Sequence, residues 1–132
     1  MAKIFALTEA SSIALHSMVI IAKSKETLNV VKISEVIGSS KHHVAKVLQR
    51  LVKDDLLDSF RGPFGGFILK KEPKSITLLE VYESIEGRIE IATCPVDKKI
   101  CPFKKCIIDN IGNQMTIDFR DYLKNQTLDL YM

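Results

Sequence analysis

The 132-residue sequence contains no tryptophan, only four prolines and only three cysteines. No run of apolar residues approaches the length of about eighteen that a membrane-spanning helix needs, so we expect no membrane partner. The first residues lack the long apolar core and the cleavage site of a secretory signal. Because three cysteines cannot all pair within one chain, we expect a reducing, cytoplasmic setting rather than a disulfide framework.

Motifs of catalysis are also missing. The sequence has no recognisable nucleophile–base motif, and its glycine-rich turn lies between two predicted strands rather than before a helix, as a phosphate-binding loop would. We therefore expect a protein that is not an enzyme. With 46% hydrophobic and 27% charged residues, the composition is that of an ordinary globular chain, and the length suits one domain, alone or with a short attached element.

The net charge of +3 is unevenly distributed. Residues 1–66 contain nine Lys or Arg against six Asp or Glu, whereas residues 67–132 contain ten of each. From Ser39 to Lys74, eight basic residues face four acidic ones. Such a basic segment is typical of nucleic-acid binding, although a merely solvated surface could have the same totals.

Two short helices joined by a glycine turn are predicted after a first helix over residues 8–22. Residues 31–37 form the shorter one, and Gly38 can end it in the left-handed conformation. Ser39 or Ser40 can cap the next helix. Its apolar residues recur at helical spacing as one stripe (Val44, Val47, Leu48 and Leu51). The arrangement predicts a helix-turn-helix.

The outward face of the second of these helices is rich in hydrogen-bond donors. These side chains can reach phosphates or base edges, and those near the helix start suit a helix whose first turn enters the major groove. The candidate DNA-binding residues on this helix are Ser40, Lys41, His42, His43, Lys46, Gln49 and Arg50.

A β-hairpin is predicted directly after this helix, with strands over residues 57–60 and 67–70. The six residues between them include three glycines and a proline, which indicates a turn. A hairpin in this position is the wing of a winged helix, and its Arg61 can enter a minor groove or hold a phosphate. The further candidate contacts are Gly62, Pro63, Gly65 and Gly66; an ordinary hairpin with a solvated Arg61 is the alternative.

Two more helices are predicted in the C-terminal half. The first runs over residues 77–85, with Thr77 and Glu80 as a capping box and Gly87 at its end. The second is a helix of about twenty residues with a long apolar stripe. The stripe consists of Ile108, Ile111, Met115, Phe119, Tyr122 and Leu123. We expect it to pack on the same helix of a second subunit, because palindromic DNA sites require two-fold symmetry; packing within its own domain is the alternative.

All three cysteines lie within thirteen residues, as Cys94, Cys101 and Cys106. Their C-x6-C-x4-C spacing lacks the paired C-x2-C of structural zinc sites, whereas thiolates are the usual ligands of iron–sulfur clusters. Four lysines in the same stretch would favour thiolates and offset a negatively charged cluster. A fourth ligand is needed, and Asp109 and Glu9 are the candidates. A thiol switch without metal and a zinc site are the alternatives.

The whole arrangement resembles the IscR/NsrR/CymR-type family of bacterial transcription regulators. The most specific parts are the segment Arg61-Gly62-Pro63-Phe64-Gly65-Gly66-Phe67 and the cysteine trio. The resemblance implies a homodimer whose winged helices bind a palindromic promoter site. It also implies that the three cysteines hold a [2Fe-2S] or [4Fe-4S] cluster, whose presence or redox state changes the affinity for DNA.

The sequence departs from the family pattern in two places. The two cysteine spacers are commonly equal in the family, whereas here Cys101 is displaced by one residue. Where some members have a histidine ligand three residues after the last cysteine, this chain has Asp109. Where others have an acidic ligand in the first helix, this chain has Ser12, with Glu9 one turn earlier. The type of cluster and its fourth ligand therefore stay open.

Together these observations predict a mainly α fold with a small β-hairpin. Residues 1–75 would form a winged helix-turn-helix DNA-binding domain, and residues 76–132 the cysteine sensor loop and a long dimerisation helix. The predicted function is a dimeric regulator that binds double-stranded DNA under the control of an iron–sulfur cluster. The alternatives are a cluster-free regulator switched by thiol oxidation or a partner protein, and an adaptor that does not bind DNA.

Overall fold

The computed structural model describes residues 6–91, 104, 107 and 111–132. In these residues five α-helices and one antiparallel two-stranded sheet form a mainly helical fold, as the sequence predicts. The elements in chain order are α1 (Glu9–Lys23), α2 (Val30–Ile37), α3 (Lys41–Lys53), β1 (Leu57–Phe60), β2 (Gly66–Leu69), α4 (Leu78–Glu86) and α5 (Ile111–Lys124), with short 3-10 turns η1 (Pro73–Ser75) before α4 and η3 (Leu128–Tyr131) after α5.

The starts of the helices are set by capping side chains. Thr8 accepts a hydrogen bond from the backbone N–H of Ser11 at 3.1 Å and begins α1. Thr77 accepts from the N–H of Glu80 at 3.1 Å, and the Glu80 carboxylate accepts from the N–H of Thr77 at 3.4 Å, which is the capping box expected for α4. Ser40 caps α3 by accepting from the N–H of His43. These local bonds explain why the predicted helix starts agree with the structure.

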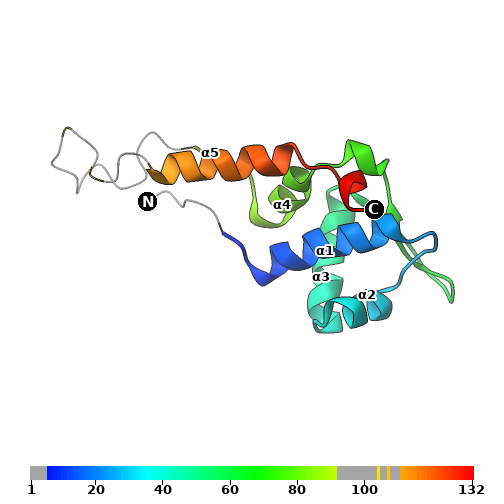
Figure 1. Ribbon diagram of the computed structural model, residues 1–132. Coiled ribbons are helices and arrows are strands. Elements are labelled where there is room, and N and C mark those ends of the chain that lie inside the picture. The colour runs from blue at the N-terminus through cyan, green and yellow to red at the C-terminus, as the bar shows by residue number, and fades with distance from the viewer. Residues whose placement is uncertain (1–5, 92–103, 105–106, 108–110) are drawn as a thin grey trace.

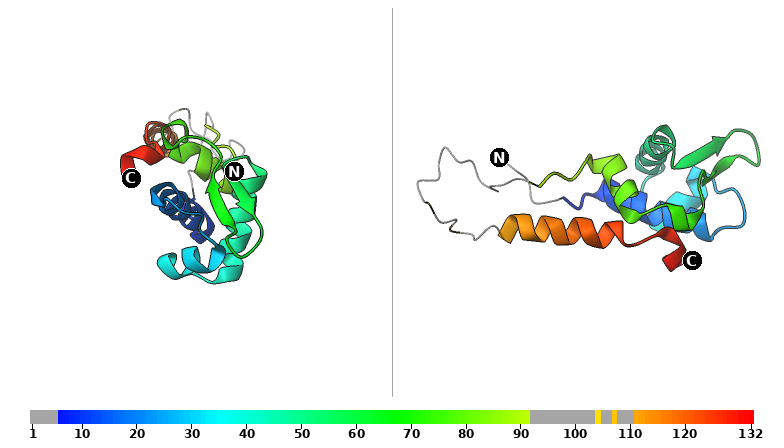
Figure 2. Two further views of the ribbon diagram at one scale, coloured as in Figure 1. Left: turned by 90° about the vertical axis from the view of Figure 1, so that its right-hand side faces the viewer. Right: turned by 90° about the horizontal axis from the view of Figure 1, so that it is seen from above.

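Helix α1 lies at the centre of the helical body. Figure 1 shows α2 on one side of it, α4 and α5 on the other, and α3 crossing behind it, and the second view in Figure 2 shows α5 running alongside α1. The inward faces meet in one hydrophobic core that includes Ile13 and Met18 of α1, Leu48 of α3 and Val81 of α4. The core therefore joins residues from both halves of the chain.

The β-hairpin is anchored through the start of β2 to the segment between α1 and α2. The N–H of Phe67 donates to the carbonyl of Leu28 at 2.8 Å, and the N–H of Leu28 donates back to Phe67 at 3.4 Å. Gly66, which pairs with Phe60, is the first residue of β2, one residue earlier than predicted. It has a φ of +153°, and a Cβ added to it would lie 2.3 Å from the Leu28 carbonyl oxygen. Only glycine fits this contact between hairpin and helical body.

Helix α5 divides its predicted apolar stripe between two faces. Phe119 packs edge-on against Tyr82 of α4, with ring centroids 5.1 Å apart, and Leu123 is buried. Ile111, Met115 and Tyr122 are exposed. The described helix has 14 residues, and the predicted start at residue 108 lies outside the described residues. The alternative of packing on its own domain is therefore correct for one face, and the other face is free in the monomer.

The chain end folds back beside the start of α4. The N–H of Leu78 donates to the carbonyl of Gln126 at 2.9 Å, and the N–H of Leu128 donates to the carbonyl of Ile76 at 3.1 Å. Leu128 is fully buried, so η3 completes the core, although the sequence analysis did not predict this turn. In the parts of the chain that the structure describes, no helix is long and apolar enough to span a membrane.

Replacing Gly66 with Ala tests the anchoring of the hairpin. We expect Gly66→Ala to lower the free energy of unfolding by about 3 kcal/mol, because overpacking against Leu28 adds to the backbone strain of a positive φ. Gly38→Ala is the matched control: Gly38 also has a positive φ, +82°, but no atom lies within 4 Å of an added Cβ. It should lose only about 1–2 kcal/mol. Equal losses in urea unfolding would contradict the proposed anchor.

Candidate nucleic-acid interface

The buried inner face of α3 determines which of its side chains are exposed to solvent. Val44, Leu48 and Leu51 are fully buried and Val47 is 4% exposed, so this helix cannot turn about its axis without losing the core. The opposite face is consequently presented to solvent. Of the predicted DNA-binding residues on α3 and its cap, Ser40, Lys41, His42, Lys46, Gln49 and Arg50 are exposed and His43 is half-buried.

The basic residues of the Ser39–Lys74 segment fall into two classes. Four of them form ion pairs within the molecule: Arg50 with Asp54, Lys70 with Asp55, Lys71 with Glu80 and Lys74 with Glu72. Among the described residues, no ion pair involves the other four, Lys41, Lys46, Lys53 and Arg61. These four lie on α3 and at the start of the hairpin turn. The cations without internal partners therefore belong to the elements predicted to contact DNA.

The ion pair of Lys70 shows how a paired cation differs from one without an internal ion pair. Its Nζ lies 2.9 Å from Asp55 Oδ1, and this hydrogen bond raises the pKa of Lys70. Lys70 therefore stays charged, but its charge is offset by Asp55 beside it. An offset charge attracts a phosphate less than a free one does.

Arg50 is held against α4. Its Nε donates to the carbonyl of Ser84 at 3.0 Å and lies 3.4 Å from Asp54 Oδ2. The hydroxyl of Ser84 donates to the same Asp54 oxygen at 2.5 Å. The three residues form a polar junction between the C-terminal turn of α3 and α4. In this structure Arg50 therefore connects two helices, a role that its place on the outward face of α3 did not suggest.

Glu9, predicted as a possible fourth metal ligand, lies beside the start of α3. Its Oε1 is 3.6 Å from His43 Nδ1 and 3.5 Å from the hydroxyl of Ser39. Its side chain is 69% exposed, so the carboxylate also remains accessible to a ligand. Glu9 thus brings the N-terminus of α1 into contact with the first turn of the helix predicted to read DNA.

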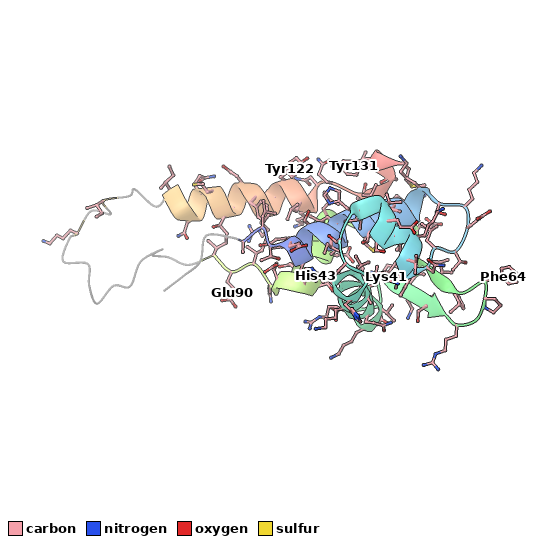
Figure 3. The ribbon with its side chains drawn as sticks, turned by 90° about the horizontal axis from the view of Figure 1, so that it is seen from below. Lys41, His43, Phe64, Glu90, Tyr122 and Tyr131 are labelled. Carbon is pink, nitrogen blue, oxygen red and sulfur yellow. The ribbon has the colours of Figure 1, made fainter. Side chains whose placement is uncertain are left out.

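The turn of the hairpin contains both exposed and buried candidate residues. Arg61, Gly62 and Pro63 are exposed and Gly65 is half-buried, whereas Gly66 is buried against Leu28. Gly66 was also predicted as a DNA contact, and the structure places it against the Leu28 carbonyl rather than among the exposed residues of the turn. The sequence analysis also missed Phe64, which is 92% exposed and stands at the end of the hairpin, away from the helices (Figure 3). Its position between Pro63 and Gly65 was the available signal.

The predicted metal ligands Cys94, Cys101, Cys106 and Asp109 lie outside the described residues. Within residues 6–91, 104, 107 and 111–132, no three His, Cys, Asp or Glu side chains are grouped so that they could hold a metal ion. Glu9 is the one member of the predicted ligand set that the structure places.

Comparison with known protein families shows which family the chain belongs to. The profile of the Rrf2 family, described as iron-dependent transcriptional regulators, matches residues 7–131. The chain belongs to the Rrf2 family. This confirms the expected IscR/CymR type of regulator. Since the relatives are named transcriptional regulators, it also confirms that the protein is not an enzyme.

Curated relatives in the Rrf2 family include the HTH-type transcriptional regulator IscR of Klebsiella pneumoniae strain 342. It is 28% identical over 124 residues, which are 92% of this chain and 76% of the relative. IscR of Pectobacterium atrosepticum is 26% identical over 125 residues, 95% of this chain and 73% of the relative. These matches support regulation of transcription through DNA binding.

Solved structures show the same fold. CymR, the global cysteine regulator of B. subtilis, superposes with a TM-score of 0.78 at 21% identity and covers 95% of this chain and 94% of its own. T. potens IscR gives a TM-score of 0.75 at 20% identity, with 95% and 84% covered. The winged-helix architecture predicted from the sequence is therefore confirmed.

Lys46 offers a test of the distinction between free and paired cations. We expect Lys46→Gln to reduce the slope of log K against log salt by about one unit per bound subunit, because one phosphate contact is lost. Lys71→Gln removes the same charge from a lysine paired with Glu80 and should leave the slope unchanged. Fluorescence anisotropy with a labelled duplex at several salt concentrations provides the measurement. Equal slopes for Lys46→Gln and the unsubstituted protein would exclude this contact.

Proposed function

We propose that this Rrf2 protein is a homodimeric regulator that binds a palindromic operator and senses a signal through its cysteines. In this proposal residues 1–75 bind the DNA and residues 76–132 carry the sensor loop and the dimerisation helix. Because the shared core contains residues of both segments, the division is one of function within one packed body. Since such a regulator acts on chromosomal DNA, we place it in the cytoplasm.

The free cations of α3 and the hairpin carry the DNA-binding part of the proposal. Lys41 and Lys46 project from the exposed face of a helix whose inner face is fixed in the core. Arg61 lies at the start of the wing, and β1 follows α3 after a short turn. A recognition helix in the major groove and a wing over the adjacent backbone are therefore compatible with one duplex.

The exposed face of α5 supports dimerisation. Three residues of α5 are well exposed, although they follow the apolar spacing of a helix that packs: Ile111 by 58%, Met115 by 45% and Tyr122 by 57%.

The exposed surface continues beyond α5. Tyr131 of η3 lies beside Tyr122 (Figure 3), and a hydrogen bond between them raises the pKa of Tyr131. Leu15 and Val19 of α1 line an apolar hollow of about 380 Å³ together with Tyr131. A second copy of α5 would cover this surface and give the two-fold symmetry of a palindromic operator.

Met115→Glu tests this dimer. We expect it to shift the protein from dimer to monomer in light scattering coupled to size exclusion, because a carboxylate would be buried without a partner. Val36→Glu is the control, since Val36 is also an exposed apolar residue, 62% exposed, but lies on α2. It should remain dimeric. A monomeric unsubstituted protein, or a dimeric Met115→Glu protein, would contradict the proposed interface.

The cysteine trio carries the sensing part of the proposal. Three thiols at C-x6-C-x4-C, accompanied by Lys98, Lys99, Lys104 and Lys105, are a donor set suited to an iron–sulfur cluster. An accessible carboxylate at Glu9, or Asp109, could complete it. We propose that Cys94, Cys101 and Cys106 hold a [2Fe-2S] or [4Fe-4S] cluster with one of these carboxylates. The bound cluster would supply redox chemistry or sensitivity to iron supply.

Helix α4 provides a route from the cysteine segment to the DNA-binding surface. It ends at Glu86, eight residues before Cys94. The hydroxyl of Thr8 donates to the carboxylate of Glu86, and Ser84 contacts both Asp54 and Arg50 of the α3 end. A shift of α4 would therefore move the first turn of α1 and the last turn of α3. We propose that the sensed signal changes DNA affinity through these contacts.

The decisive experiment for sensing is anaerobic purification from an iron-replete host, followed by iron and sulfide analysis and an absorption spectrum. We expect a coloured protein that contains both elements, and loss of both in the variant in which Cys94, Cys101 and Cys106 are all replaced by Ser. Glu9→Gln and Asp109→Asn should show which carboxylate is the fourth ligand, through an altered spectrum in one variant only. Colourless, iron-free protein would refute the cluster.

A thiol switch is the second candidate for sensing. One solved structure with this fold is an oxidised form of Staphylococcus aureus CymR, with a TM-score of 0.76. If this chain is a thiol switch, replacing its cysteines with Ser would abolish a response of DNA binding to oxidants without any change in bound iron. An adaptor that does not bind DNA would instead show no salt-dependent affinity for a duplex.

A further inference from the structure

Phe64 is the most exposed large hydrophobic side chain among the described residues, at 92%. Phe67, three residues later on the same hairpin, is only 6% exposed and packs into the core. A phenylalanine left in water gives up the hydrophobic stabilisation that burial of its ring would provide. Folding stability therefore does not explain an aromatic ring at the end of the hairpin (Figure 3).

The turn that carries Phe64 is preformed. The N–H of Gly65 donates to the carbonyl of Gly62 at 2.9 Å and closes a tight turn around Pro63 and Phe64. Gly62 has a φ of +107°, and a Cβ at Gly65 would lie 2.3 Å from the carbonyl oxygen of Phe60. Because proline also restricts the backbone before it, the ring is held on a short rigid loop. Such a loop loses little conformational entropy when it docks.

The two strands of the hairpin fix this loop relative to the recognition helix. Phe67 is hydrogen-bonded to Leu28, which lies just before α2, and β1 continues from α3 through a bond from the N–H of Leu56 to the carbonyl of Leu51 at 3.0 Å. Arg61, a cation without an internal ion pair among the described residues, stands three residues before Phe64. When α3 lies in a major groove, the wing is thus held toward the neighbouring backbone and minor groove.

We propose that Phe64 is an apolar wedge that enters the minor groove beside the phosphate contact of Arg61 and partly unstacks a base step. Apolar side chains used in this way kink the duplex, and pyrimidine–purine steps yield most easily. Phe64 would therefore select operators that have a TA or CA step under each wing, without a hydrogen bond to any base. This inference rests on the proposed DNA binding and adds a residue that determines its specificity.

The test needs a duplex that the full-length dimer recognises. A randomised pool of duplexes is first selected with the unsubstituted protein, and the enriched sequence becomes the probe. We expect Phe64→Ala to bind this probe about ten-fold more weakly, and Phe64→Leu to stay within about three-fold, because leucine is also an effective wedge. Phe60→Ala is the matched control: it removes a 53% exposed phenylalanine of the same hairpin, which ends β1 and lies outside the Gly62–Gly65 turn, and should leave affinity unchanged.

Unstacking is measured separately with 2-aminopurine placed at successive adenines of the probe. Its fluorescence should rise at one step under each wing with the unsubstituted protein and Phe64→Leu, and should not rise with Phe64→Ala. If Phe64→Ala binds and unstacks like the unsubstituted protein while Arg61→Ala binds weakly, the wedge is refuted and DNA binding stands. If selection enriches no sequence and no duplex binds in a salt-dependent way, the proposed function fails together with the wedge.

Discussion

The packing of α3 against α1 and α4 is the constraint on which the rest of the structure depends. Val44, Leu48 and Leu51 are completely buried, and burying each of these side chains contributes about 1.5–3 kcal/mol. A rotation of α3 would expose them, so the orientation of the helix is fixed by the core and not by any ligand. The free face with Lys41 and Lys46 is the consequence of this packing. The orientation of the hairpin is fixed as well, because β1 follows α3 after a short turn and β2 is bonded to Leu28.

Helix α4 connects the core to the surrounding elements. Its inward face contributes Val81 and Tyr82, while its C-terminal end contacts other elements through polar side chains. The hydroxyl of Tyr82 donates to the carbonyl of Ala6 at 2.5 Å, Glu86 accepts from Thr8, and Ser84 is bonded to Asp54 and Arg50. These bonds converge from the N-terminal segment, from α1 and from α3. Because these partners belong to three different elements, a displacement of this end of α4 would reach all of them, which suits a regulator of affinity.

Local patterns predicted the elements well because local interactions form them. The caps at Thr8, Ser40 and Thr77 and the apolar stripe of α3 depend on residues three and four apart, which a sequence displays directly. Contacts between distant residues could not be seen in this way. The bond from Arg50 to Ser84, the close approach of Gly66 to the Leu28 carbonyl and the division of the α5 stripe each depend on tertiary packing. Phe64 was overlooked because an apolar residue in a turn belongs to no helical or strand period, and only its neighbours Pro63 and Gly65 indicated that it lies in an exposed turn.

In the proposed complex, two recognition helices read major grooves while the wings lie over minor grooves on one face of a palindromic duplex. Methylation interference tests it most directly, because dimethyl sulfate modifies guanine N7 in the major groove and adenine N3 in the minor groove. With a duplex enriched by the protein, we expect guanine interference in two half-sites about one helical turn, or a multiple of it, apart, and adenine interference beside each half-site. Interference confined to one groove, or lacking two-fold symmetry, would contradict it.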